Sequence, residues 1–273
     1  MTIRLGSNDI SMTLQRHLKT STSQLNTSME KLSTGFRINR ASDDPAGLAI
    51  AEGMKATING LGVAENNIQQ AMNLLGTAEG ALNAMLSQVQ DFRDLGVSAS
   101  TGTVTDFTPF TTASSGIRDA VTKIGDTAEF NGNMLLDGSN TSYVIQVGAD
   151  SGAANQLTLA GGVFANIDAT SLSLDNITNT ATANNAITDA DAAITTITNR
   201  LSQIGAYQNA LQSQLEMVQN TRTNYQAAEA NIREVDVAEE TANLTRLQVI
   251  QQASAAMLAQ ANQNSQIGLA LLG

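Results

Sequence analysis

The sequence predicts a mainly α-helical protein: long antiparallel helical rods with coiled-coil-like packing, a small β-hairpin region, and paired N- and C-terminal helices. Composition is the first reason. The 273 residues include only six Phe, three Tyr, no Trp and two Pro. Compact cores are usually richer in large side chains than this, whereas long helices can pack through Leu, Ile, Met and Ala. The second reason is that apolar residues recur at alternating steps of three and four along two stretches. These stretches have similar lengths, so each offers the partner that the other's apolar stripe needs.

The first predicted rod covers residues 45–98. Its start is marked by Ser42, Asp43 or Asp44 as N-cap, with Pro45 at the first helical position. Most positions along its seam are apolar. The seam runs through Ala51, Met54, Ile58, Leu61, Glu65, Ile68, Met72, Leu75, Glu79, Leu82, Leu86, Val89 and Arg93.

The second rod covers residues 183–235 and would be about 80 Å long at the helical rise of 1.5 Å per residue. Its seam is also mostly apolar and is sustained over several heptads, as in a coiled coil. It runs through Ile187, Ala190, Ile194, Ile197, Leu201, Ile204, Gln208, Leu211, Leu215, Val218, Arg222, Tyr225, Glu229 and Ile232.

Between the rods we expect a shorter helix over about 108–129 and then a β-hairpin region over about 132–182. The strand-like runs are separated by Asp-Gly and by turns rich in Gly, Asn and Ser. They are Met134 to Leu136, Tyr143 to Val147 and Gln156 to Leu159. Residues 161–182 are rich in Asn, Thr and Ala, which indicates a loop or a weak extra strand.

The two ends of the chain are unusual. Residues 247–273 contain no charged side chain but many Gln and Asn among apolar residues, which fits neither a surface helix nor a membrane span. We therefore expect terminal helices that are buried among other protein helices. The candidate contact residues are Leu14, Leu18, Leu25, Leu32, Leu244, Leu247, Ile250, Met257, Leu258, Ile267 and Leu271.

The remaining features argue against several functional classes. A net charge of −11 with 14 Lys and Arg makes a nucleic-acid surface improbable, and the absence of an 18-residue apolar run argues against membrane insertion. His17 is the only histidine and there is no Cys, so we expect no catalytic triad, no metal site and no cofactor. Asp43 and Asp44 would suit an acid/base or cation-binding pair, but helix capping explains them better.

Two stretches resemble bacterial flagellins. They are INRASDDPAGLAIAEGM at residues 38–54 and NLTRLQVIQQASAAMLAQANQ at residues 243–263; further similarity lies in GTAEGALNAML, EFNGNMLLDG, IQVGADSGAANQLTL and RLSQIGAYQNALQ. Together these cover most of the chain in the order and spacing of that family. The resemblance implies a secreted structural subunit, without enzymatic activity, that polymerises into the extracellular flagellar filament for swimming motility.

For this chain the resemblance implies an inner-tube domain at 1–44 and 236–273 and an outer-tube domain at 45–235. It implies a short form without the variable outer domains, and assembly through the terminal helices. The implied partners are further copies of the chain, a flagellar export chaperone with the type III export apparatus, and the hook-associated junction and cap proteins.

One segment departs from the family. Flagellins that the animal innate-immune receptor recognises carry Gln-Arg-Ile/Val-Arg-Glu-Leu-Ala-Val-Gln on the rod. The matching receptor-like segment here includes Gln90, Asp91, Arg93 and Leu95, so the first Arg of the motif has become Asp91. This charge reversal predicts weak or absent receptor activation.

Three alternatives stay open at this point. A hook–filament junction protein can share the Ser-Asp-Asp-Pro-Ala-Gly sequence, although the Gln-rich C-terminal signature favours flagellin. An enzyme would need a cluster of titratable groups, such as the His-Glu-x-x-His insert of some flagellins, which one histidine cannot supply. A membrane-active helical protein of a secretion system is the third, and liposome binding would distinguish it.

Overall fold

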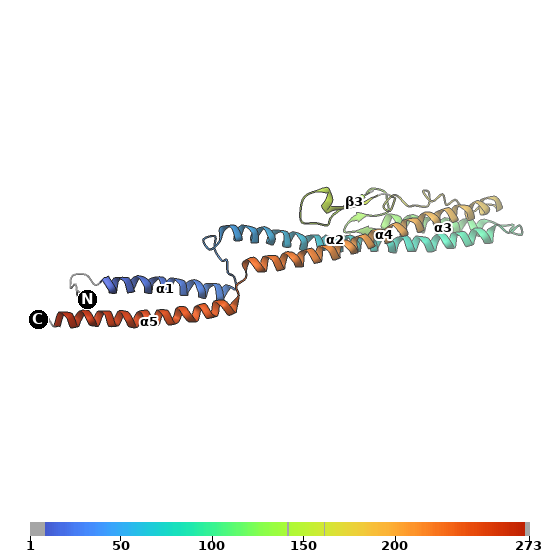
Figure 1. Cartoon of the computed structure of the whole chain (residues 1–273). Coiled ribbons are helices and arrows are strands. Elements are labelled where there is room, and N and C mark those ends of the chain that lie inside the picture. The colour runs from blue at the N-terminus through green and yellow to red at the C-terminus, as the bar shows by residue number, and fades with distance from the viewer. Residues whose placement is uncertain (1–8, 141, 161, 271–273) are drawn as a thin grey trace. The chain divides into compact units, whose positions relative to one another are not determined.

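The computed structural model describes residues 9–140, 142–160 and 162–270 and confirms a mainly α-helical fold with small antiparallel sheets (Figure 1). Its helices are α1 (Asp9–Thr34), α2 (Pro45–Ala99), α3 (Thr108–Thr127), α4 (Thr180–Arg233) and α5 (Val237–Ala270). The chain divides into a terminal unit (residues 1–56 and 224–273) and a central unit (residues 57–223). These units divide inside α2 and α4, whereas the domain boundaries predicted after residues 44 and 235 follow the breaks between helices and stay a prediction.

Capping fixes where α2 begins. The Asp44 carboxylate accepts hydrogen bonds from the backbone amides of Ala46 and Gly47 at 3.1 and 3.0 Å, which makes Asp44 the N-cap among the three predicted candidates. Asp43 caps the preceding turn, because its carboxylate accepts from the amides of Asn39 and Arg40 at 3.1 and 2.9 Å. These backbone hydrogen bonds lower the pKa of Asp43. The acidic pair is therefore structural.

The turns beside Arg233 tie the terminal unit together. Gly35, with φ of +76°, ends α1 and donates to the carbonyl of Lys31. Phe36 then pairs with Glu234 in an isolated antiparallel bridge. The Arg233 guanidinium lies 4.6 Å from the centre of the Phe36 ring and 2.9 Å from the Glu52 carboxylate. These contacts thus fix the positions of the short connections that follow α1 and α4, which have little regular secondary structure.

In the central unit, polar seam positions of α2 and α4 bind to each other. Arg222 donates to Glu65 at 2.5 Å, and Gln208 donates to Glu79 at 2.8 Å. Glu65 and Glu79 lie two heptads apart, and so do Gln208 and Arg222. Two polar interruptions of one predicted seam are therefore matched by two in the other, and this matching fits the antiparallel register.

Half of the buried stripe of α2 coincides with the predicted seam, and the other half is displaced by one residue. Half of the prediction is confirmed, because Leu61, Ile68, Leu75, Leu82 and Val89 are buried. The other buried half comprises Ala64, Ala71, Ala78, Met85, Phe92 and Ala99, whereas Met54, Met72 and Leu86 are only partly buried. Small Ala side chains thus take buried positions that the spacing of apolar residues alone does not distinguish from those of the larger Met and Leu.

Two hairpins follow α3. In the first, β1 (Glu129–Phe130) pairs with β2 (Asn133–Met134). In the second, β3 (Ser142–Gln146) pairs antiparallel with β4 (Gln156–Ala160), so that Tyr143 lies opposite Leu159. The strand predicted over Met134 to Leu136 was wrong beyond its first residue, because Leu135 and Leu136 are fully buried in the core without a strand partner.

The segment over 162–179, expected as a loop or weak strand, forms no strand and supplies much of the central core. Its buried residues are Val163, Phe164, Ile167, Ala169, Leu172, Leu174 and Ile177. Phe164 makes an edge contact with Tyr143, with ring centroids 4.9 Å apart. Arg200 of α4 donates to the carbonyl of Ala165 at 2.7 Å, and burial lowers the pKa of this guanidinium. Backbone groups of irregular chain are thus satisfied while its side chains fill the core.

Candidate assembly interface

The helices α1 and α5 lie side by side and antiparallel in the terminal unit (Figure 1). The contact surface of α1 follows a heptad in which Leu and Ser share the seam. Its positions are Ser11, Leu14, Leu18, Ser21, Leu25, Ser28 and Leu32. The facing positions of α5 are Glu240, Leu244, Leu247, Gln251, Ser254, Leu258 and Ala261. All of these side chains are buried or half-buried.

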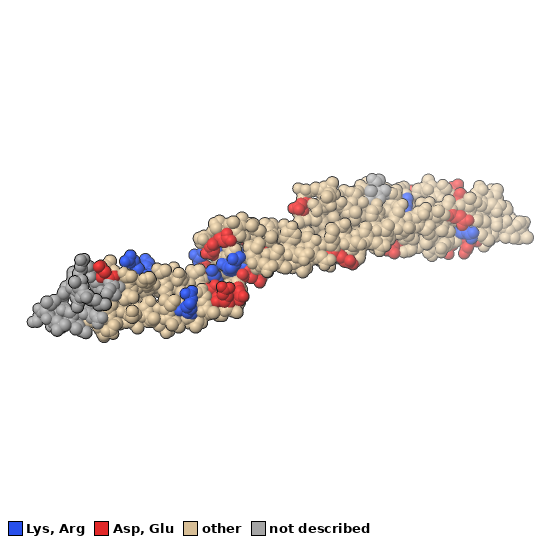
Figure 2. Space-filling view, viewed as in Figure 1, with Lys and Arg blue, Asp and Glu red and all other residues tan. Residues whose placement is uncertain are grey.

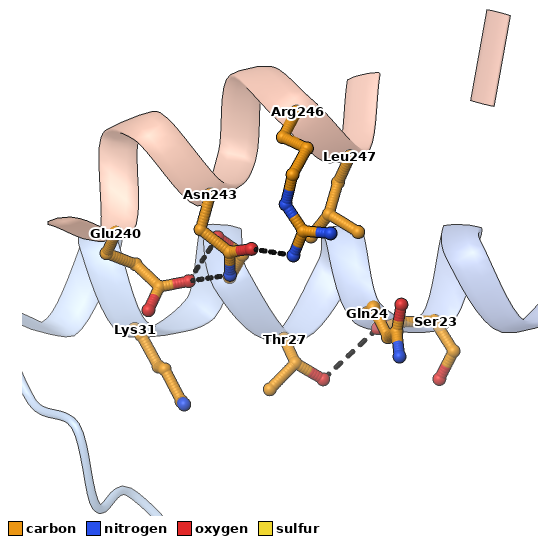
Figure 3. Close-up of a pocket in the computed structure, with 9 residues that line it drawn as sticks. Ser23, Gln24, Thr27, Lys31, Glu240, Asn243, Arg246 and Leu247 are labelled. Carbon is orange, nitrogen blue, oxygen red and sulfur yellow. Dashed lines mark hydrogen bonds between the residues drawn. The ribbon is translucent and has the colours of Figure 1, made fainter. Parts of the chain in front are cut away.

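Polar contacts cross this seam at intervals. Ser28 of α1 donates across the seam to the Glu240 carboxylate of α5 at 2.5 Å, and Asn243, on the same helix as Glu240, donates to the same oxygen at 3.1 Å (Figure 3). Farther along, Gln251 donates to Thr22 at 3.1 Å. Burial alone would raise the pKa of Glu240, but the hydrogen bonds from Ser28 and Asn243, together with the nearby Lys31 charge, lower it. The carboxylate thus holds the two helices together in its charged form.

Outside the seam, α5 presents apolar side chains to the surroundings. Val249 is 59% exposed and Met257 is 60% exposed, while Ile250 between them is 39% exposed. No residue from 247 onward is charged. Figure 2 shows few acidic or basic side chains on the visible face of the α1 and α5 pair. This uncharged face of α5 resembles the unpaired side of a helical bundle more than a solvated surface.

Two grooves run between the helices. The first has a volume of 290 Å³ and is polar, as the close-up shows (Figure 3). Its lining residues are Ser23, Gln24, Thr27, Ser28, Lys31, Glu240, Asn243, Arg246 and Leu247. The second groove has a volume of 510 Å³ and is bordered by apolar side chains of both helices. Its lining residues are Leu14, His17, Thr20, Ser21, Gln24, Ile250, Ala253, Ser254 and Met257.

The structure separates the predicted contact residues into two sets. Leu25 and Leu247 are buried in the seam, with Leu14, Leu18, Leu32, Leu244 and Leu258 half-buried along it. Ile250 and Met257 instead point out of the seam as part of the exposed face. The side chain of Ile267 and all of Leu271 lie outside the described residues. One helix pair thus covers only part of the predicted contact set.

Sequence reasoning missed the serines of the seam. Ser21 and Ser28 are 3% and 2% exposed, although serine is usually a surface residue. The signal was present, because counting by threes and fours from Leu14 reaches Leu18, Ser21, Leu25 and Ser28 in turn. Small hydroxyl side chains let the helices approach closely while leaving hydrogen-bonding groups in the seam.

This arrangement offers surfaces for packing against other protein. Among the residues that the structure describes, no three His, Cys, Asp or Glu side chains gather closely enough to hold a metal ion. Within the same residues, no helix combines the length and the apolar character that crossing a bilayer requires. What the terminal unit presents is a helix pair with an uncharged and partly apolar outer face.

The receptor-like segment lies on α2 in the central unit. Gln90 and Asp91 are exposed, while Leu95 is half-buried against the core. Arg93 donates to Asp191 of α4 at 2.7 Å, and this hydrogen bond raises the pKa of the guanidinium. Asp91 is therefore exposed, whereas Arg93 is engaged in an ion pair within the chain.

Family comparisons agree with this architecture. The family described as the bacterial flagellin N-terminal helical region matches residues 6–141, and the bacterial flagellin C-terminal helical region matches residues 187–272. A solved structure of a putative flagellar hook-associated protein from Vibrio parahaemolyticus has a TM-score of 0.58, with 14% identity, over 70% of this chain and 100% of that one. At this identity the likeness shows a shared fold alone.

Curated relatives extend the match over nearly the whole chain. The flagellin of Halalkalibacterium halodurans is 40% identical over 263 residues, which cover 96% of each chain. The flagellin of Bacillus subtilis is 36% identical over 309 aligned positions, covering 99% of this chain and 100% of the relative. The chain therefore belongs to the bacterial flagellin family, whose members are structural, non-enzymatic subunits of the flagellar filament that drives swimming.

Proposed function

We propose that this subunit polymerises through its α1 and α5 helix pair, and that the uncharged outer face of α5 makes contacts with neighbouring copies. The observation that carries the proposal is the exposure of Val249 and Met257, at 59% and 60%, on a helix surface without charged residues. Such a surface is costly to leave in water and typical of a contact site.

The energetics favour a polymer over the free subunit. Burying one Val, Ile or Met side chain contributes about 1.5–3 kcal/mol, whereas ordering a rotamer-rich interface side chain costs about 0.5–1.5 kcal/mol. The surplus for one side chain is small. A helical lattice repeats it along Val249, Ile250 and Met257 in every copy, and a head-to-tail contact that does not close generates an open filament.

The flagellin resemblance supports a further set of partners. We place the subunit in the extracellular filament, after passage through the flagellar type III export apparatus and with the hook-associated junction and cap proteins at the filament ends. A cytosolic export chaperone would cover the C-terminal helix beforehand. The uncovered apolar face of α5 gives a physical reason for such a chaperone, because the same face would promote premature association in the cell.

A single charge tests the role of this face. The Ile250→Asp variant should lose polymerisation, because an unpaired buried carboxylate costs several kcal/mol in each contact. Val237→Asp is the matched control: Val237 is 58% exposed on the same helix but lies in its first turn, where an acidic residue is favourable. Seeded assembly followed by light scattering and electron microscopy measures both. Normal filaments from Ile250→Asp would contradict the proposal.

A further inference from the structure

Two Asn-Gly pairs occur in the sequence, Asn59 with Gly60 and Asn131 with Gly132. Both asparagine side chains are exposed. An asparagine that precedes glycine is chemically open to spontaneous deamidation, because glycine has no Cβ to hinder its own backbone nitrogen and leaves the backbone free to rotate. The two pairs lie in different backbone environments, so one chain contains both the candidate site and its comparison.

The first pair is held inside a helix. Asn59 and Gly60 belong to α2, in which each backbone amide is bonded to the carbonyl four residues earlier. Gly60 is also covered from outside the helix, since a Cβ built on it would lie 2.9 Å from the Cβ of Ala149. The Gly60 nitrogen cannot turn toward the Asn59 side chain unless the helix opens. This pair is therefore protected although Asn59 is exposed.

The second pair forms the whole turn between β1 and β2. Asn131 and Gly132 have φ of +52° and +78°, and Phe130 pairs with Asn133 on either side of them. Positive φ at both central residues is the conformation that two-residue hairpins require. This hairpin has only two residue pairs, so opening it costs far less free energy than opening the middle of a long packed helix.

We propose that Asn131 is a site of spontaneous deamidation in this protein. The backbone nitrogen of Gly132 gives its proton to solvent, attacks the Cγ atom of Asn131 and closes a five-membered succinimide ring. The carboxamide nitrogen takes up a proton and leaves as ammonia. Water then adds to one of the two ring carbonyls and opens the ring. The products are an aspartyl and an isoaspartyl residue, and in either case the chain gains one negative charge.

The isoaspartyl product disturbs the hairpin more than the aspartyl product does. Aspartate tolerates the left-handed conformation, whereas isoaspartate adds one backbone methylene to a turn of two residues and shifts the register of the strands that it joins. Directly after β2, the amide of Leu135 donates to the carbonyl of Ala128 at 2.8 Å, and Leu135 and Leu136 are fully buried. A reaction at the surface thus reaches the core of the central unit through the backbone.

Incubation of the full chain compares the two sites directly. The folded protein is held at neutral and at mildly alkaline pH, and its peptides are analysed by mass spectrometry with electron-transfer fragmentation to distinguish isoaspartate. We expect Asn131 to be converted at least about tenfold faster than Asn59, which corresponds to about 1.4 kcal/mol of additional opening free energy at the helical site. Conversion should be faster at the higher pH, because the attacking nitrogen must lose its proton. An intact Asn131, or equal rates at the two sites, would overturn the proposal.

The same incubation in concentrated urea tests whether the fold causes the difference. Both sites have the same Asn-Gly sequence, so their rates should become similar once α2 and the hairpin are unfolded. A difference that persists unchanged in urea would contradict the roles assigned to the helix and to the turn.

A matched pair of variants identifies the source of the new charge. Glycine adopts positive φ without strain, so Asn131→Gly should keep the helical spectrum and the melting of the parent, yet lose the acidic species that ion-exchange chromatography separates from the incubated parent chain. Asn59→Gln, which removes the helical pair and leaves the turn unchanged, should still form that species. The proposal fails if Asn131→Gly accumulates the acidic species as the parent does.

Amide exchange tests the consequence for the core. The isoaspartyl fraction of the incubated chain is compared with the Asn131→Asp variant, which carries the same charge on an unaltered backbone. We expect the amides of Leu135 and Leu136 to exchange several times faster in the isoaspartyl fraction. Equal exchange in the two samples would show that the extra methylene stays confined to the turn and would overturn this part of the proposal.

Discussion

The core of the central unit and the α1 and α5 pair are both helical, but they bury very different side chains. The central core fully buries large residues such as Phe92, Phe164, Leu82 and Met85. The terminal pair buries Leu25 and Leu247 beside three serines, and it leaves Val249 and Met257 exposed. The central unit thus contains its own packing partners, whereas the terminal pair leaves apolar side chains exposed, as the proposed assembly interface requires.

Hydrogen bonding shows the same contrast. In the central unit, Arg222 and Gln208 of α4 meet Glu65 and Glu79 of α2, so the polar positions of both helices are matched within one chain. In the terminal pair, the Ser21 hydroxyl has no such match among the residues described. We therefore expect folding and assembly to depend on different parts of the sequence.

The sharpest way to separate the two regions is to delete residues 244–273. Most of α5 and its uncharged face are then gone, while every residue of the central unit remains. We expect complete loss of polymerisation together with an intact helical spectrum and cooperative melting of the central unit. Circular dichroism and sedimentation check these outcomes, and filaments formed by the truncated chain would refute the separation.

The next effect concerns folding itself. Phe164→Ala should lower the free energy of unfolding by about 3–5 kcal/mol, because it empties a fully buried site in the irregular segment. Val144→Ala is a control in the neighbouring hairpin: Val144 is 57% exposed, and its truncation should cost about 0.5 kcal/mol or less. Urea denaturation measures both. Equal, small effects would mean that the segment over 162–179 is not part of the core.

A smaller effect is expected at the polar end of the terminal seam. The folded-state pKa of Glu240 is lowered, so its charged form stabilises the helix pair above the unfolded-state pKa, and this contribution is lost as the pH falls through the lowered value. Glu240→Gln should weaken pairing at pH 7 by about 1 kcal/mol or less, since the carboxylate is partly solvent-screened. Amide exchange of α1 as a function of pH tests this, and an identical acid profile in the variant would contradict it.

The smallest effect on the fold is expected at Asp91. Because Asp91 is exposed on α2, Asp91→Arg should change the free energy of unfolding by about 0.5 kcal/mol or less. It should nevertheless raise activation of the innate-immune receptor, since complementary charges govern such contacts. Asp119→Arg, an exposed position on α3, controls for net charge in a reporter-cell assay. Parent activity equal to that of a flagellin with the intact motif would disprove the prediction.

The positions of the helices could be predicted because the spacing of apolar residues and the capping residues indicate the same helices. The expected rods at 45–98 and 183–235 correspond to Pro45–Ala99 and Thr180–Arg233, and the Asp-Pro signal marks the start of α2. It was harder to predict which apolar residues of the helices are buried. Alanine and methionine are both apolar, so the spacing of apolar residues does not distinguish them. The residues packed around them in the folded structure determine that Ala71 is buried while Met72 is only partly buried.

The irregular core segment and the serine seam escaped prediction for physical reasons. The buried side chains of 162–179 follow no helical or strand period, because long-range contacts such as those from Arg200 and Thr111 hold the backbone. Serine carries no apolar signal, so Ser21 and Ser28 were invisible to a hydrophobic count. The terminal contact residues were predicted as one set, but the division between the half-buried or buried leucines of the seam and the exposed Ile250 and Met257 depends on the partner helix.

Hydrogen–deuterium exchange of the full chain, compared between monomer and filament, tests the central claim most directly. If the terminal pair is completed by neighbouring copies, the backbone amides of α1 and α5 should show the largest gain in protection on assembly. The core segments of the central unit, around Leu82 and Leu174, should already be strongly protected in the monomer. Full protection of α1 and α5 in the monomer, with the gain confined to the central unit, would contradict this account.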